Sequence, residues 1–173
     1  MSRLDEVWKW YEAARDSLRI VRSLLETQPD AIPPSLAAGT VFETQPRSEV
    51  LQRLRQAEQE LDDLTIVALW ASFEQQVLDH LEQAVQRTLK QKRRDRLQQR
   101  ILQERLAKPR YWRFEEVLDL YKEIIDPQLV GDVKQVLQYR NWVAHGRTSR
   151  MPPNIIPRIA YERLKDFLGQ LNP

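Results

Sequence analysis

The feature that most constrains this chain is a stretch of about forty residues, from Ser48 to Lys90, without glycine or proline. Apolar residues recur through it every three or four positions, from Val50 to Val85, which is the spacing of one face of an α-helix. Such a helix is longer than the roughly 30 Å diameter of a small domain. It must therefore pack along neighbouring helices or kink.

Four further segments have the same helical spacing, and no hairpin signal or internal repeat is found. They cover residues 3–26, 111–126, 127–146 and 154–171. Residues 28–46, with four prolines and no clean period, are expected to form an irregular connection over the surface. We therefore predict a single all-α domain, residues 1–173, built as a bundle of five or six helices.

The amino-acid composition limits the kinds of functional site that the chain can form. The chain has no cysteine, which excludes disulfides, thiolate metal sites and a thiol nucleophile. Its two histidines lie far apart, so we expect no metal and no cofactor. Charges recur through the first nineteen residues, unlike a signal peptide, and the uncharged run LTIVALWASF is too short to cross a bilayer. We expect a cytoplasmic protein without a membrane partner.

Charge is distributed unevenly. Residues 90–110 contain nine basic residues against two acidic ones, a net charge of +7, so the remainder carries −5 of the chain's total of +2. This basic block, which includes Lys108 and Arg110, is expected to form a short helix ending before Pro109. It suits contact with an anion or a nucleic acid. The alternative is a helix face that is simply solvated.

The segment over residues 127–146 breaks its apolar pattern near its end, in the sequence QYRNWVAHGRTS (Gln138–Ser149). The apolar face that includes Leu137 continues at positions occupied by Arg140, Asn141 and Ala144. Buried polar groups are costly unless paired, and such breaks tend to fall at functional or strained sites. The alternative is that the helix leaves the core here and its polar residues meet water.

Asn141 and His145 are four residues apart, about 40° around a helix, and share a face. Arg140 and His145 are five apart, roughly 140°, so one regular helix does not point them at each other. They can meet around a ligand if Gly146 loosens the last turn, or if a symmetric partner supplies a second copy of both.

RNWVAH, from Arg140 to His145, resembles the R-x4-6-H motif of the HEPN superfamily, in its form with Asn after the Arg. These are all-α domains of similar size that carry the motif on a late helix, and many are metal-independent ribonucleases of toxin–antitoxin, CRISPR-associated and anti-phage systems. The resemblance implies a HEPN-like bundle and an endoribonuclease. An antitoxin or another regulatory protein is a partner it suggests.

The resemblance also implies roles for the motif residues. The ribose 2′-OH attacks the adjacent phosphate, with His145 as general base or acid. Arg140 holds the phosphate and offsets its growing charge, while Asn141 orients His145 or donates to the phosphate. Products would carry 2′,3′-cyclic phosphate and 5′-OH ends, and DNA would not be cut. Two protomers would pair so that both motifs face one cleft, which predicts a homodimer.

The chain departs from one HEPN subgroup, which has a modified Tyr two residues after the His, because Arg147 stands there. Regulation by that route is therefore not expected. Arg147 and Arg150 are candidate RNA contacts, or else exposed loop arginines. Trp142 is a candidate platform for stacking a base, although core packing would explain most of the five tryptophans.

Two other residues have open interpretations. Glu74 follows a strongly apolar run and either reaches the site from a neighbouring helix or is a surface carboxylate. His80 lies at the edge of the apolar stripe, as a boundary histidine or a ligand. The second functional hypothesis is a non-catalytic HEPN-like module that binds RNA, a nucleotide or a protein partner.

Overall fold

The structure, a computed structural model, describes residues 2–28, 32–90 and 113–171. All regular elements within these ranges are helices, which confirms the all-α prediction. In chain order they are α1 (Arg3–Thr27), α2 (Pro34–Ala37), α3 (Val41–Thr44), α4 (Arg47–Lys90), α6 (Phe114–Asp119), α7 (Pro127–Ala144) and α8 (Pro157–Leu171). The single domain and the HEPN-like arrangement stay predictions.

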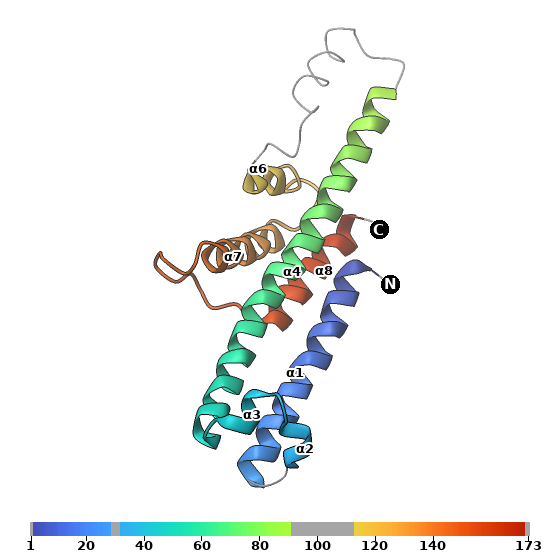
Figure 1. Cartoon of the computed structure of the whole chain (residues 1–173). Coiled ribbons are helices and arrows are strands. Elements are labelled where there is room, and N and C mark those ends of the chain that lie inside the picture. Colours follow the sequence, from blue (N-terminus) through green and yellow to red (C-terminus); the bar gives the residue numbers. More distant parts are fainter. Residues whose placement is uncertain (1, 29–31, 91–112, 172–173) are drawn as a thin grey trace.

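Helix α4 is 44 residues long and connects the two ends of the molecule (Figure 1). Its length is accommodated by neighbours, as expected: α1 lies along its first half, and α7 and α8 pack on its middle. The core between α4, α7 and α8 contains large side chains that are almost fully buried, among them Trp70, Phe73 and Phe167. This core fixes the position of α7, which carries the motif.

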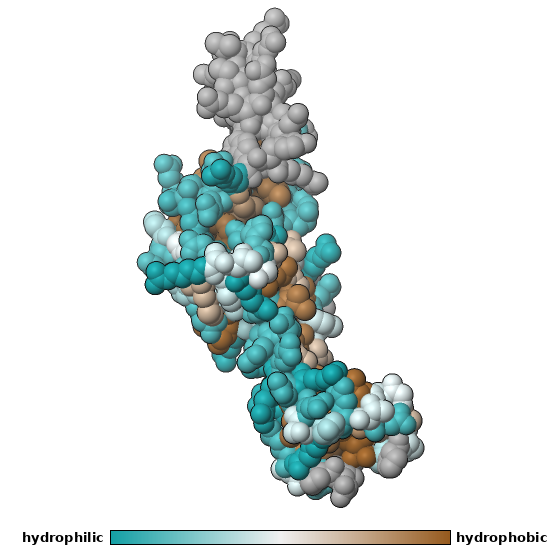
Figure 2. All heavy atoms as spheres, turned by 60° about the vertical axis from the view of Figure 1, so that its left-hand side comes forward, coloured by the Kyte–Doolittle hydropathy of each residue, from teal (hydrophilic) through white to brown (hydrophobic). Residues whose placement is uncertain are grey.

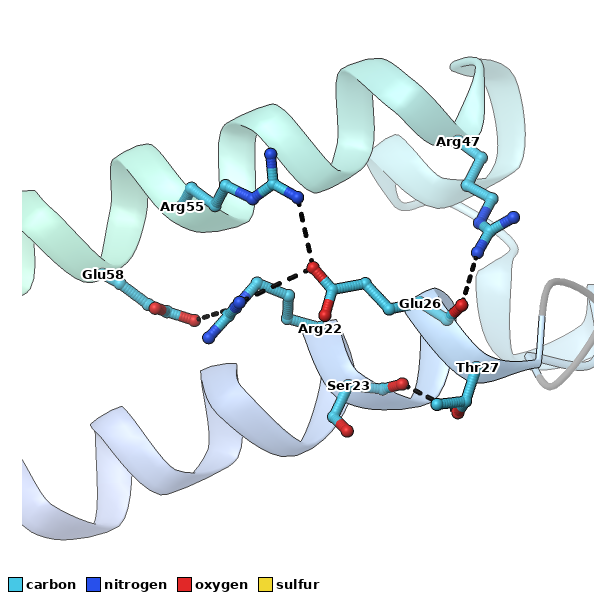
Figure 3. Close-up of polar contacts among 7 residues, drawn as sticks. All are labelled: Arg22, Ser23, Glu26, Thr27, Arg47, Arg55 and Glu58. Carbon is cyan, nitrogen blue, oxygen red and sulfur yellow. Dashed lines mark hydrogen bonds and ion pairs between the residues drawn. The ribbon is translucent and has the colours of Figure 1, made fainter.

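A second, smaller apolar cluster lies at the far end of α1 and α4, around Leu25, Val50 and Leu54. Figure 2 shows apolar side chains among hydrophilic ones at this end of the molecule. Charged side chains link α1 to α4 here (Figure 3): Arg22 Nε lies 2.8 Å from Glu58 Oε1, and Arg55 Nη2 lies 3.2 Å from Glu26 Oε1. This end therefore depends on polar contacts as well as on a few buried side chains.

The first turn of α1 is held by contacts from its own chain and from α8. Ser2 and Asp5 exchange hydrogen bonds in a capping box. The Tyr161 hydroxyl donates to Asp5 at 2.6 Å, and Lys165 Nζ lies 3.1 Å from the same carboxylate. The hydrogen bond from Tyr161, with those from Ser2 and Lys165, holds the pKa of Asp5 far below its usual range.

Several expectations need correction. In the described part of the helix predicted over 111–126, from residue 113 onward, only α6 is regular, because the chain continues from Asp119 in tighter turns with hydrogen bonds to the third residue back. The connection over 28–46 contains the short helices α2 and α3. Leu64 and Ile156, which belong to the apolar pattern of the segments over 48–90 and 154–171, are nevertheless 58% and 52% exposed. The helix expected for the basic block lies outside the described residues beyond Lys90.

Candidate functional site

The end of α7 follows the predicted pattern closely. The helix begins after the N-cap Asp126, with Pro127 in its first turn, and ends at Ala144 with His145 as its C-cap. Gly146 follows with a φ of 74°, a left-handed conformation that suits glycine and closes the helix as expected. The next residue, Arg147, also has a positive φ, of 59°, which is uncommon for a residue with a side chain.

Arg140 lies at the edge of the core, neither fully buried nor at a frayed surface. Its Nη1 donates to Asn141 Oδ1 at 3.0 Å. Its Nε is buried and has no hydrogen-bond partner. A guanidinium has five N–H donors, and a buried donor without a partner is costly. Arg140 therefore has hydrogen-bonding capacity that the described residues leave unused.

Arg140 faces a hollow of about 320 Å³ between α4, α6 and α7, which we call the Arg140 pocket. Its lining consists of Trp70, Glu74, residues 113–115, Leu137, Arg140 and Asn141. Glu74 thus lies beside the motif, which resolves its position in favour of the neighbouring-helix interpretation. The Trp70 indole Nε1–H donates to Glu74 Oε2 at 3.0 Å, so the carboxylate has a fixed direction.

His145 is exposed and lines a different hollow, which we call the His145 pocket. This pocket of about 330 Å³ is lined by Gln138, Asn141, Trp142, His145, Ser149 and Arg150, among others. The Trp142 indole donates to the Ser149 carbonyl oxygen at 3.0 Å, and its ring packs against the main core. This bond ties the loop after α7 to the helix.

Asn141 lines both pockets and therefore lies between Arg140 and His145. The three motif residues are brought together at one helix end, where Arg140 lines the Arg140 pocket and His145 lines the His145 pocket. This separation agrees with the five-residue offset read from the sequence. A substrate that contacts both side chains must span the two pockets or lie between two copies of the chain.

Arg147 is engaged elsewhere. Its Nη1 and Nη2 lie 2.9 Å from the two carboxylate oxygens of Glu60, and Nη2 also contacts Asp63. These hydrogen bonds raise the pKa of the Arg147 guanidinium above its ordinary value and lower that of the Glu60 carboxyl. The side chain predicted to contact RNA is thus turned onto α4 and paired with carboxylates.

The Arg147 guanidinium belongs to a third hollow, the acidic pocket, where Asp62, Asp63 and Glu60 of α4 face Tyr139 and Arg147. The Tyr139 hydroxyl donates to Asp63 at 2.7 Å. Burial, together with this hydrogen bond, raises the pKa of Tyr139. Sequence reasoning missed these partners, because they come from α4, 76 to 87 residues away in the sequence, and no local pattern connects the two segments.

The other predicted site residues are only partly described. Arg150 is exposed and lines the His145 pocket, whereas Lys108 and Arg110 lie outside the described residues. His80, on α4, lies with its Nδ1 3.2 Å from the Tyr121 hydroxyl and is not a lining residue of the three pockets described above. In the described part of the chain, no cluster of three or more His, Asp or Glu side chains is arranged to hold a metal ion. No described helix is long and apolar enough to cross a membrane.

Comparisons with protein-family models, with curated proteins and with solved structures find no match for this chain. The resemblance to the HEPN superfamily therefore depends on residues 140–145 and on the all-α architecture.

Proposed function

We propose that the chain is a metal-independent endoribonuclease of the HEPN type. The observation that carries the proposal is the arrangement at the end of α7. Arg140 has a buried Nε without a partner, His145 is exposed at the C-cap, and Asn141 lines the pockets of both. The six residues 140–145 thus contain guanidinium donors and an imidazole, the groups that cleavage at a phosphate needs, and they border two pockets.

In the proposed reaction, the 2′-oxygen of one ribose attacks the adjacent phosphorus, and the bond from that phosphorus to the 5′-oxygen of the next nucleotide breaks. His145 moves protons as general base and general acid. Arg140 donates to the phosphate oxygens, where a guanidinium fork stabilises the growing charge. The 2′-oxygen remains in the cyclic phosphate product, and the leaving 5′-oxygen takes a proton.

The proposed active form is a homodimer. Arg140 and His145 line different pockets of one chain, and we place the scissile phosphate between two protomers, with Arg140 from one protomer and His145 from its partner. A toxin or anti-phage effector of this kind also needs control, which we assign to an antitoxin or another regulatory protein. The basic block of residues 90–110 would hold the RNA backbone.

The test is cleavage of RNA by purified protein in EDTA, compared with Arg140→Ala and His145→Ala. Arg158→Ala and His80→Gln are matched controls, since both residues lie outside the three pockets. We expect 2′,3′-cyclic phosphate ends, no cleavage of RNA with a 2′-deoxy group at the cut site, and activity only in wild type and controls. Equal cleavage by all variants would refute the proposal.

Mixing the two inactive variants tests the shared site. An Arg140→Ala protomer paired with an His145→Ala protomer retains one complete Arg–His pair across the interface and none within a chain. Partial recovery of cleavage after mixing supports a site between protomers. No recovery, with mixed dimers demonstrated by mass spectrometry, would show that each chain uses its own pair.

A second candidate function is a non-catalytic module that binds RNA, a nucleotide or a protein. The separation of Arg140 and His145 into two pockets is the observation that favours it. It predicts salt-sensitive RNA binding that depends on the basic residues of 90–110. It also predicts that no product ends form and that His145→Ala leaves binding unchanged.

A further inference from the structure

The Arg140 pocket has walls of two kinds. The Phe114 ring and Leu137 provide an apolar side, and Phe114 packs edge-on against Trp70 with ring centroids 5.2 Å apart. Opposite charges complete the lining, with Glu74 from α4 and Arg140 from α7. Apolar walls with a few fixed polar groups are typical of sites for small organic groups.

The orientation of the Glu74 carboxylate in this pocket is set by a hydrogen bond. Glu74 is half-buried on a long helix, and the indole of Trp70, which is 1% exposed, donates to Oε2. No ion pair joins Glu74 to Arg140 among the described residues, and Trp70 is the hydrogen-bond partner that the structure gives Glu74. A carboxylate accepts about four hydrogen bonds, so Glu74 retains free acceptor sites in the pocket.

We propose that the Arg140 pocket binds a guanine base of the RNA, with Glu74 accepting hydrogen bonds from its N1–H and 2-amino groups. The inference rests on the proposed ribonuclease function and names its base preference. An ionised carboxylate is an acceptor only. Guanine presents two adjacent donors on its Watson–Crick edge, whereas adenine, cytosine and uracil have no two donors side by side there. Single-stranded RNA exposes this edge for recognition.

The charges of the pocket argue against other occupants. Arg113 and Arg140 line the same hollow as Glu74 and Glu115, so the formal charges of the lining cancel and give a divalent cation or a basic side chain no net attraction. A nucleotide suits this lining, because its neutral base can donate hydrogen bonds to a carboxylate while its phosphate pairs with a guanidinium group. The base meets Glu74 and the apolar wall, and the phosphate meets Arg140, whose Nε has no partner.

The experiment measures binding of GMP, IMP and AMP at pH 7 by isothermal titration calorimetry, with no cleavage involved. IMP lacks the 2-amino group, and AMP also replaces N1–H with an acceptor. We expect GMP to bind roughly 10- to 100-fold more tightly than AMP, with IMP in between. The variant Glu74→Gln keeps an acceptor for the Trp70 indole and should lose this order. Glu116→Gln, exposed on α6 and outside the pocket lining, is the matched control.

The outcomes separate the two proposals. Equal binding of GMP, IMP and AMP to the wild-type protein overturns guanine recognition, whether or not RNA is cleaved. A preference for GMP that persists in Glu74→Gln, with the variant folded by circular dichroism, overturns the role of Glu74. A preference for GMP that is lost in Glu74→Gln supports the inference even if cleavage in EDTA fails, which would refute only the ribonuclease.

Discussion

The Arg140 pocket and the acidic pocket each contain an arginine from the end of α7 or the loop after it, and these two arginines, Arg140 and Arg147, are used differently. In the acidic pocket, Arg147 is paired with Glu60 and Asp63. In the Arg140 pocket, Arg140 donates to Asn141 and keeps a buried Nε without a partner, while Glu74 is turned to Trp70. The comparison suggests that Arg147 holds the loop in place, whereas Arg140 is left for a ligand.

The backbone supports this distinction. Arg140 lies within the regular helix α7, but Arg147 follows it in a left-handed conformation. Such a conformation costs roughly 1–2 kcal/mol for a residue with a Cβ atom, so other contacts must compensate for it. The carboxylates on α4 and the hydrogen bond from Arg147 N to the Trp142 carbonyl oxygen, at 2.9 Å, provide them.

The largest difference is expected in cleavage, on substituting each arginine by lysine. Arg140→Lys keeps the charge but loses the planar fork, and we expect cleavage to fall roughly 100-fold. Arg147→Lys should change cleavage by only a few-fold, since a lysine still reaches the carboxylates. Initial rates in EDTA measure both. A larger loss in Arg147→Lys than in Arg140→Lys would reverse the assignment of roles.

Tyr139→Phe tests whether the acidic pocket stabilises the fold, because Tyr139 contributes to this pocket from α7. Tyr139 is 5% exposed, and its hydroxyl donates to Asp63. Removing a hydrogen bond to a charged group should lower the free energy of unfolding by about 1.5–3 kcal/mol. Urea denaturation measures this change. If stability is unchanged while cleavage collapses, then the acidic pocket belongs to the catalytic site and the comparison fails.

Arg147→Gly and Arg147→Ala separate the backbone from the side chain. Both lose the contacts with Glu60 and Asp63, but glycine adopts a φ of 59° without the steric cost that alanine has. We expect Arg147→Gly to be more stable than Arg147→Ala by about 1 kcal/mol. Equal stability in urea denaturation would show that the loop changes its conformation once the ion pairs are lost.

The sequence predicted the helices and the place of the motif, because both depend on local pattern. Helical spacing located α1, α4, α7 and α8 within a few residues, and Asp126, Pro127 and Gly146 marked the ends of α7. The offset between Arg140 and His145 also anticipated their separate pockets, since it follows from helix geometry alone.

Contacts between residues that are distant in the sequence could not be predicted from local sequence patterns. Arg147 had two open interpretations, an RNA contact or an exposed loop arginine, and only the packing of α7 on α4 brings Glu60 and Asp63 to it. Glu74 had two open interpretations, because its distance from Arg140 in the sequence says nothing about their distance in space. Apolar residues on helix surfaces, such as Leu64, follow the helical pattern but are exposed, because periodicity cannot tell where a neighbouring helix ends.

The smallest expected effect is a pH dependence of the contribution of Arg147. The hydrogen bond from Arg147 lowers the pKa of Glu60 below its ordinary value of 4.5. A depressed pKa gives stability that is present above the ordinary value and is lost as the pH falls through the folded-state pKa. The stability difference between wild type and Arg147→Gly should therefore be largest near pH 7 and shrink towards pH 3. Thermal unfolding across this range measures it, with Arg158→Gly as a control on a different helix. A difference that stays constant would mean that Arg147 acts through its backbone, and the contrast with Arg140 would then lie in conformation and not in charge.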